Sequence, residues 1–181
     1  EQAILYGHDA AANAVAFTPD GRRMVSVGDD GLVLVWNTEG PAERREPEAR
    51  LTGHEGKILQ VAVSGDGRLA ATASWDGRIG LWSLDPPGAL GMLQGHKGPV
   101  NAVALSDDGG RLYSAGYDGT VRLWDVAQRR ELRTLARHGF GVNVIAVDEA
   151  AGRMAYGALD GGMRLVDLAS GEVRTAFEHD R

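Results

Sequence analysis

The amino-acid sequence predicts an all-β protein built from four copies of one short unit, and three observations support this. Histidine recurs at intervals of 46, 42 and 42 residues, at His8, His54, His96 and His138. Short apolar and β-branched runs alternate with turn residues inside each interval. Glycine accounts for 26 of 181 residues, about twice its ordinary share of roughly 7%. Because a period of roughly 20–50 residues determines the architecture of a repeat protein, the repeat dominates the prediction.

The repeat also holds at positions beyond histidine. Counted from each histidine, position 18 is Ser26, Thr72, Ser114 and Tyr156, position 22 is Asp30, Asp76, Asp118 and Asp160, and position 28 is Trp36, Trp82, Trp124 and Val166. The longer first interval places its four extra residues after Trp36. We expect them in a surface loop between Thr38 and Glu48, which contains Pro41 and Pro47.

The third unit illustrates the strands in order. Apolar and β-branched runs predict strands at 100–106, 112–116, 121–126 and 131–135. The turn signals between them are Asp107-Asp-Gly-Gly110, Asp118-Gly119 and Gln128-Arg129. Asp-Gly and Gly-Gly supply the positive φ angles of tight hairpins, which accounts for the glycine excess. Four antiparallel strands per unit make one blade of a β-propeller, where neighbouring blades cover both faces of each sheet.

The segments Leu93-Gln-Gly-His96 and Val121-Arg-Leu-Trp-Asp125 resemble the two ends of the WD40-repeat signature. The resemblance extends from Gly7 to Phe177. It implies four four-stranded blades near residues 12–52, 58–94, 100–136 and 142–177, with residues 2–6 as a spare outer strand. The blades would form an open arc or half of a closed ring.

The recurring histidine, serine and aspartate also fit the Ser-His-Asp group of hydrolases. An enzyme needs one exposed site of this kind, whereas identical spacing in three units favours a structural role. The resemblance implies a buried hydrogen-bonded tetrad in each of three blades: His8, Ser26, Asp30 and Trp36; His54, Thr72, Asp76 and Trp82; and His96, Ser114, Asp118 and Trp124. Tyr156 and Val166 depart from this pattern, so we expect the fourth blade to be weaker.

Charge, cysteine content and motifs narrow the classes of partner, location and site that the chain can have. The net charge of −6 comes from 19 bases and 25 acids without a basic stripe, which disfavours nucleic acid. The absence of cysteine excludes disulfides, thiolate zinc sites and cysteine nucleophiles, and it fits a reducing, cytoplasmic location. No apolar run approaches the roughly 18 residues of a membrane span. No calcium loop or phosphate-binding loop is present in the sequence, so we expect no metal and no cofactor.

WD40 proteins commonly bind proteins or peptides on the face around the central channel. Carried over by position, the contact residues would be Ala11, Asn13, Asp29, Lys57, Leu59, Trp75, Pro99, Asn101, Tyr117, Gly141, Asn143 and Leu159. Trp75 is the only tryptophan outside the repeat phase, and tryptophan and tyrosine are common binding anchors. The alternative is that Trp75 and Tyr117 only cover adjoining loops.

The leading hypothesis is therefore a non-catalytic scaffold for protein–protein interactions. The alternative is a half-propeller that closes a ring of about eight blades, by homodimerisation or with further repeats, as a structural or regulatory part of a larger signalling protein. An open arc would expose the apolar flanks of its first and fourth blades, which are association sites. A third possibility, an accessory domain of an enzyme, is favoured by no feature of the sequence.

Overall fold

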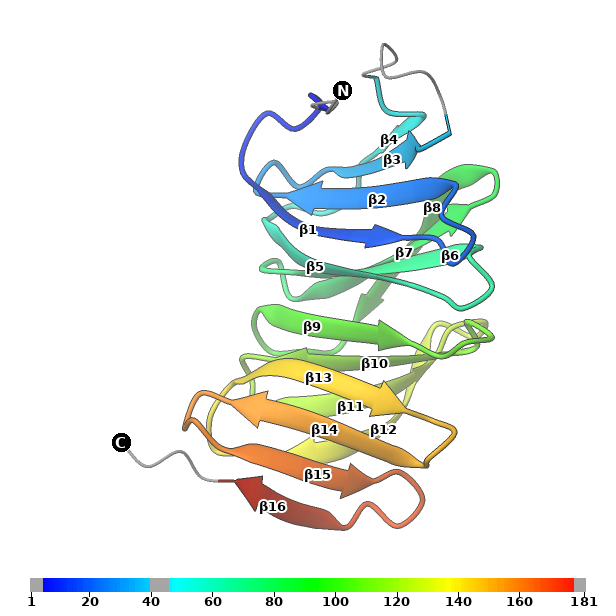
Figure 1. Cartoon of the computed structure of the whole chain (residues 1–181). Helices are drawn as coiled ribbons and strands as arrows, with labels where there is room; N and C mark the ends of the chain where they lie inside the picture. Colours follow the sequence, from blue (N-terminus) through cyan, green and yellow to red (C-terminus); the bar gives the residue numbers. More distant parts are fainter. Residues whose placement is uncertain (1–4, 40–45, 178–181) are drawn as a thin grey trace.

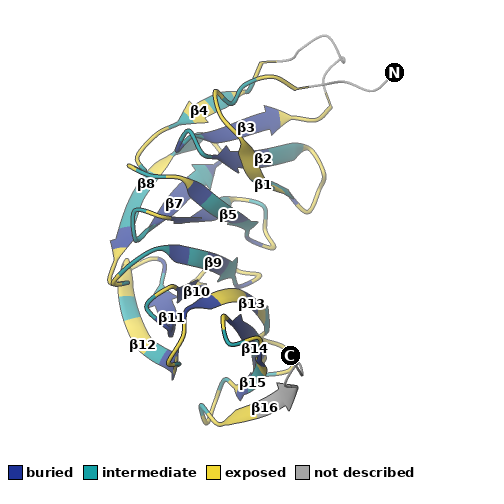
Figure 2. Cartoon of the chain, turned by 90° about the vertical axis from the view of Figure 1, so that its left-hand side faces the viewer, coloured by how far each residue is buried: buried dark blue, intermediate teal, exposed yellow. Residues whose placement is uncertain are grey.

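The computed structural model describes residues 5–39 and 46–177, and all regular structure in these ranges is β (Figure 1). Sixteen strands in this part of the chain form four antiparallel sheets, each made of four strands that are consecutive in sequence. Each sheet has the form of a propeller blade, and the sheets do not close into a ring (Figure 2).

The strand bounds repeat from sheet to sheet. The first sheet contains β1 (Ala12–Phe17), β2 (Arg23–Gly28), β3 (Val33–Asn37) and β4 (Ala49–Leu51), and the second contains β5 (Ile58–Val63), β6 (Leu69–Ser74), β7 (Arg78–Leu84) and β8 (Pro87–Gln94). The third contains β9 (Val100–Leu105), β10 (Arg111–Gly116), β11 (Thr120–Asp125) and β12 (Arg130–Arg137), and the fourth contains β13 (Val142–Asp148), β14 (Arg153–Ala158), β15 (Met163–Asp167) and β16 (Val173–Phe177).

The sheets stack in chain order along an arc (Figure 2). Strands β1, β5, β9 and β13 follow one side of the arc, and consecutive members of this row contact each other. The outermost strands β4, β8 and β12 follow the other side. Each sheet therefore has one neighbour on each face, except the first and the last.

Apolar side chains from adjacent sheets form the cores between blades. Between the first and second sheets, Val25 and Val33 pack in one cluster with Ile58, Val61 and Trp82. Similar clusters fill the spaces between the second and third sheets and between the third and fourth. Each fully buried side chain of this size contributes roughly 1.5–3 kcal/mol of transfer free energy. The blade-to-blade joints are thus the hydrophobic core of the described chain.

Two backbone features recur in every blade. A glycine 23 residues after each histidine has a positive φ, with values of 73° at Gly31, 80° at Gly77, 74° at Gly119 and 85° at Gly161. These glycines complete the tight turn between the second and third strands, because a side chain would be strained there. In addition, the pairing of each inner strand with its neighbour shifts register near the strand's start, as it does between Ala12 and Ala14.

The sequence predicts a spare outer strand at the start of the chain and no membrane span. The spare outer strand was expected at residues 2–6; residues 2–4 lie outside the described ranges, and Leu5 and Tyr6 form no strand. Among residues 5–39 and 46–177, no helix has the length and apolar composition that crossing a bilayer requires.

Candidate functional site

In each of the first three blades a chain of hydrogen bonds links tryptophan to aspartate. In the second blade, Trp82 Nε1 donates to Thr72 Oγ1 at 2.9 Å, Thr72 Oγ1 lies 2.7 Å from His54 Nε2, and His54 Nδ1 lies 2.8 Å from Asp76. The same contacts, at 2.7–3.1 Å, join the equivalent residues of the other two blades: Trp36, Ser26, His8 and Asp30, and Trp124, Ser114, His96 and Asp118.

The hydrogen bonds of each tetrad all run in one direction, from tryptophan to aspartate. An indole N–H can only donate and an ionised carboxylate can only accept, so the hydroxyl donates to Nε2 and Nδ1–H donates to the aspartate. Burial lowers the pKa of His54 and of His96, although the paired aspartates oppose this, and the neutral ring that results fits the arrangement. Ser26, Thr72 and Ser114 are buried and already accept from an indole. A hydroxyl so enclosed cannot reach a substrate as a nucleophile does.

The aspartate of each tetrad also joins two segments of backbone. Asp76 accepts from the backbone N–H of Glu55, next to its histidine, and from that of Arg78, in its own turn. Burial raises the pKa of this carboxyl, but the hydrogen bonds from His54 and the two amides lower it by more, so the net shift is downward. The pKa of Asp30 and that of Asp118 are lowered in the same way. The tetrads thus tie the turn to the segment that enters the blade.

The fourth blade has a different arrangement at these positions. His138 turns its Nε2, rather than Nδ1, to Asp160 at 3.0 Å. The buried Tyr156 ring stands edge-on to His138, with centroids 6.2 Å apart, where the other blades have a small hydroxyl side chain. Arg164 donates to the same aspartate at 2.5 Å. An ion pair and ring packing here replace the continuous relay of hydrogen bonds, because Tyr156 fills its space and the Val166 side chain has no N–H to donate.

A buried arginine belongs to the third tetrad, and the sequence analysis missed it. Arg122 donates to Thr120 Oγ1 at 2.9 Å, to Glu131 at 2.8 Å and to Asp118 at 3.2 Å. These partners satisfy a guanidinium that is almost fully buried. The available signal was the repeat itself, since Arg164 holds the same position in the fourth unit.

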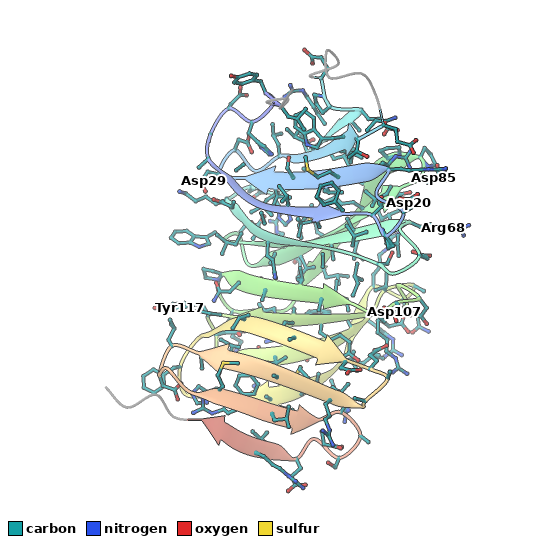
Figure 3. The ribbon with its side chains drawn as sticks, viewed as in Figure 1. Asp20, Asp29, Arg68, Asp85, Asp107 and Tyr117 are labelled. Carbon is teal, nitrogen blue, oxygen red and sulfur yellow. The ribbon has the colours of Figure 1, made fainter. Side chains whose placement is uncertain are left out.

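The residues just before the tight-turn aspartates form a row of equivalent positions: Asp29, Trp75, Tyr117 and Leu159. The backbone N–H of each donates to a carbonyl in the segment that enters its blade; the acceptor is Lys57 for Trp75 and Pro99 for Tyr117. The exposed fraction is 59% for Trp75, 61% for Tyr117 and 47% for Leu159. We call the face that carries this row the contact face; Figure 3 shows Asp29 and Tyr117 along this edge of the arc.

Several other expected contact residues are engaged with each other. Lys57 Nζ forms a 2.5 Å ion pair with Asp29, and Asn13 Nδ2 donates to the same carboxylate at 2.8 Å. Asn13 Nδ2 also lies 2.9 Å from the carbonyl oxygen of Ile58 in the next blade. Exposed ion pairs contribute about 0–1 kcal/mol, so the main effect of this group is to order the contact face between the first two blades.

Asn101 has the same place in the third blade as Asn13 in the first. Its Nδ2 donates to the Val142 carbonyl at 2.9 Å and to Asn143 Oδ1 at 3.1 Å. Leu59 occupies the position in the second blade, where a side chain without donors cannot form such a bridge. Asn143 is exposed on the last blade. Of the expected contact residues, Trp75, Tyr117 and Leu159 are therefore the large apolar side chains left open to solvent.

The opposite face of the arc is charged. Figure 3 places Asp20, Arg68, Asp85 and Asp107 along it, far from Tyr117. Within the described ranges, no group of three or more His, Asp or Glu side chains is arranged to hold a metal ion. The contact face thus carries an exposed aromatic and apolar row beside the Asp29–Lys57 ion pair, whereas Figure 3 shows charged residues along the opposite face.

Comparison with known proteins relates the chain to a family and to a curated protein. The family described as WD domain, G-beta repeat matches residues 1–37, 45–83 and 88–125, and the matched residues end before the divergent fourth unit. Lissencephaly-1 homolog 1 of Paramecium tetraurelia is 43% identical over 44 residues. That segment covers 24% of this chain and 11% of the relative, so the chain spans only a small part of that protein.

Proposed function

The chain belongs to the WD40-repeat family, and we propose that it is a non-catalytic scaffold that binds a protein or peptide partner through its contact face. The observation that carries this proposal is the exposure of Trp75, Tyr117 and Leu159 at equivalent positions of three consecutive blades. Large apolar side chains so arranged are typical of interaction sites.

The chemistry of the row suggests the kind of partner. Trp75 and Tyr117 offer flat rings with little side-chain entropy to lose, which favours a partner segment with apolar side chains. Gly141 lies next to Tyr117 and Leu159: a Cβ there would be 3.1 Å from Leu159 Cδ1 and 3.3 Å from Tyr117 Cδ2. These two side chains therefore flank one narrow strip of backbone, and a ligand segment would lie along it.

The alternative, in which Trp75 and Tyr117 only cover adjoining loops, requires them to be largely buried by those loops. Their exposed fractions of 59% and 61% argue against it. The tetrad hydroxyls, by contrast, are enclosed, which supports a role without catalysis. The net charge of −6 supports a partner other than nucleic acid, and the absence of cysteine supports a cytoplasmic location.

The experiment is a selection from a random peptide library on the immobilised chain, followed by affinity measurements on variants. We expect Trp75→Ala to weaken the selected peptides at least about tenfold, as loss of an aromatic anchor does. Leu132→Ala is the matched control, because Leu132 is also an exposed apolar residue, at 41%, but lies on the outermost strand β12.

Thermal stability separates binding from folding in this test. A loss of affinity without a change in the melting temperature of Trp75→Ala supports the anchor. Equal binding by both variants, or a drop in melting temperature that explains the lost affinity, would overturn the proposal for this face.

A second role, assembly into a larger ring, is favoured by one further observation. Val15 on the inner strand of the first blade is 58% exposed, whereas the equivalent residues Val61, Val103 and Ile145 are 7%, 3% and 7% exposed. Among the described residues, no blade covers this position of the first blade as a neighbouring blade does elsewhere. Closing the arc would bury it, and the ring would serve as a structural or regulatory part of a larger assembly.

A further inference from the structure

The two open flanks of the arc are the two halves of the joint that the chain repeats three times in its described part. In each internal joint, the fourth and seventh residues after the histidine of the following blade are buried. These residues are Ile58 and Val61, Val100 and Val103, and Val142 and Ile145. Their counterparts in the first blade, Ala12 and Val15, are exposed. We call this surface the first flank.

The other half of the joint is open on the last blade. Met163 is 38% exposed, while the equivalent residues Val33, Ile79 and Val121 are at most 1% exposed. Val144 is 48% exposed, against 2% for Ala102 at the same position in the third blade. We call this surface the last flank. It is apolar at the positions where the internal joints are apolar.

A polar contact recurs in two of the three internal joints of the described chain. The pairing of each inner strand shifts next to the fourth residue after the histidine. In two of the three internal joints the carbonyl of that residue accepts from an asparagine of the preceding blade: Ile58 accepts from Asn13, and Val142 accepts from Asn101. Asn143 holds the donor position on the last flank. The acceptor position on the first flank is the carbonyl of Ala12, beside the same register shift. One chain therefore carries both the donor and the acceptor half of this bridge.

We infer that the last flank binds the first flank of a second copy of this chain, with Asn143 donating to the Ala12 carbonyl of that copy. This inference rests on the proposed assembly role and names its partner. Since each copy has one flank of each kind, two copies form two equal joints and leave neither flank open. A contact between unlike surfaces that closes in this way gives a finite two-fold ring, whereas one that does not close gives a filament.

Solution mass and one charged substitution test the inference. The chain has a mass of 19.2 kDa, and we expect light scattering to report twice this value. Val15→Asp leaves the fold of the monomer intact because Val15 is exposed in one copy. It should raise the dissociation constant of the dimer at least about a hundredfold, since an unpaired carboxylate would be buried in an apolar joint. Leu132→Asp makes the same charge change away from both flanks and should leave the dimer unchanged.

Thiol cross-linking tests which surfaces meet. Asn101 Nδ2 and Asn143 Oδ1 lie 3.1 Å apart across an internal joint. The equivalent pair across the new joint is Asn143 of one copy and Asn13 of the other. The natural chain has no cysteine, which makes Asn13→Cys and Asn143→Cys clean probes. We expect disulfide-linked dimers when the two single variants are mixed and none from either variant alone.

The outcomes separate the inference from the role on which it rests. A dimer that survives Val15→Asp, or in which either single variant cross-links with itself, would overturn the pairing of unlike flanks and leave assembly standing. A monomer at every concentration tested would overturn both self-assembly and the inference. Peptide binding at Trp75 is measured independently of either result.

Discussion

Replacing Thr72 with valine isolates the contribution of one tetrad. Valine has the shape of threonine but puts a methyl group where the hydroxyl was. The hydroxyl lies 2.9 Å from Trp82 Nε1 and 2.7 Å from His54 Nε2, and both groups would lose their partner. Water has no room to replace it, because even a Cβ built on Gly80 would lie 2.5 Å from Thr72 Oγ1.

The expected cost follows from these two groups. An unpaired buried donor or acceptor costs about 1–3 kcal/mol, so two of them destabilise the blade by roughly 2–6 kcal/mol. That is a large part of the roughly 5–15 kcal/mol by which domains are stable. The matched control is Thr72→Ser, which keeps the hydroxyl, as Ser26 and Ser114 do, and loses one methyl group worth about 1 kcal/mol.

The assay is urea unfolding followed by tryptophan fluorescence, with the midpoint and the slope determined for each variant. The slope matters because blades of a repeat protein can unfold separately. We expect the midpoint to fall in the order wild type, Thr72→Ser, Thr72→Val. If Thr72→Val were as stable as the wild type, or no less stable than Thr72→Ser, the tetrad would not be the structural tie that its geometry indicates.

Three further predictions concern acid, a turn and a joint. In the folded chain the pKa values of His54 and His96 lie below the ordinary 6.5. The unfolded chain therefore binds more protons in this range, and the free energy of unfolding should fall as the pH is lowered from about 7 to about 5; equal melting temperatures at both pH values would contradict this. In Gly119→Ala the new Cβ would clash with the His138 carbonyl oxygen, whereas in Gly161→Ala it would meet open space at a similar φ. Calorimetry should therefore show a loss of stability for Gly119→Ala that exceeds the roughly 1 kcal/mol of backbone strain expected for Gly161→Ala; equal losses would contradict this. Tyr113→Phe removes the 2.5 Å hydrogen bond from Tyr113 to Glu149 across the joint between the third and fourth blades. It should lower the free energy of unfolding by about 1.5–3 kcal/mol in chemical denaturation; an unchanged midpoint would show that the bond contributes nothing.

The repeat spacing was enough to predict the blades because each tetrad uses residues at constant separations. A hydrogen-bonded chain fixes which residue types must recur, so its members can be read from a single sequence. The joints were harder to predict. Asn13 and Asn101 share one position with Leu59, and only the structure shows that the two asparagines bridge blades through the carbonyls of Ile58 and Val142.

Side-chain orientation was also beyond the sequence. The spacing predicts that His138 and Asp160 lie together. It does not predict that the imidazole ring is reversed, because the reversal depends on the volume of Tyr156. Likewise, the repeat positions predict Asp29 and Lys57 as contact residues but carry no sign that the two form an ion pair with each other. Such outcomes depend on packing between segments, and periodicity carries no information about that.

The relay from tryptophan to aspartate has a consequence for how the chain reaches its structure. Its contacts join residues only 10, 18 and 22 positions apart, and each sheet consists of strands consecutive in sequence. Each unit is therefore a segment of low contact order that can assemble before its neighbours do. Structure can start in any of the three relay-containing units and spread by nearest-neighbour docking, so a newly made chain need not wait for its last residues before its first blade forms.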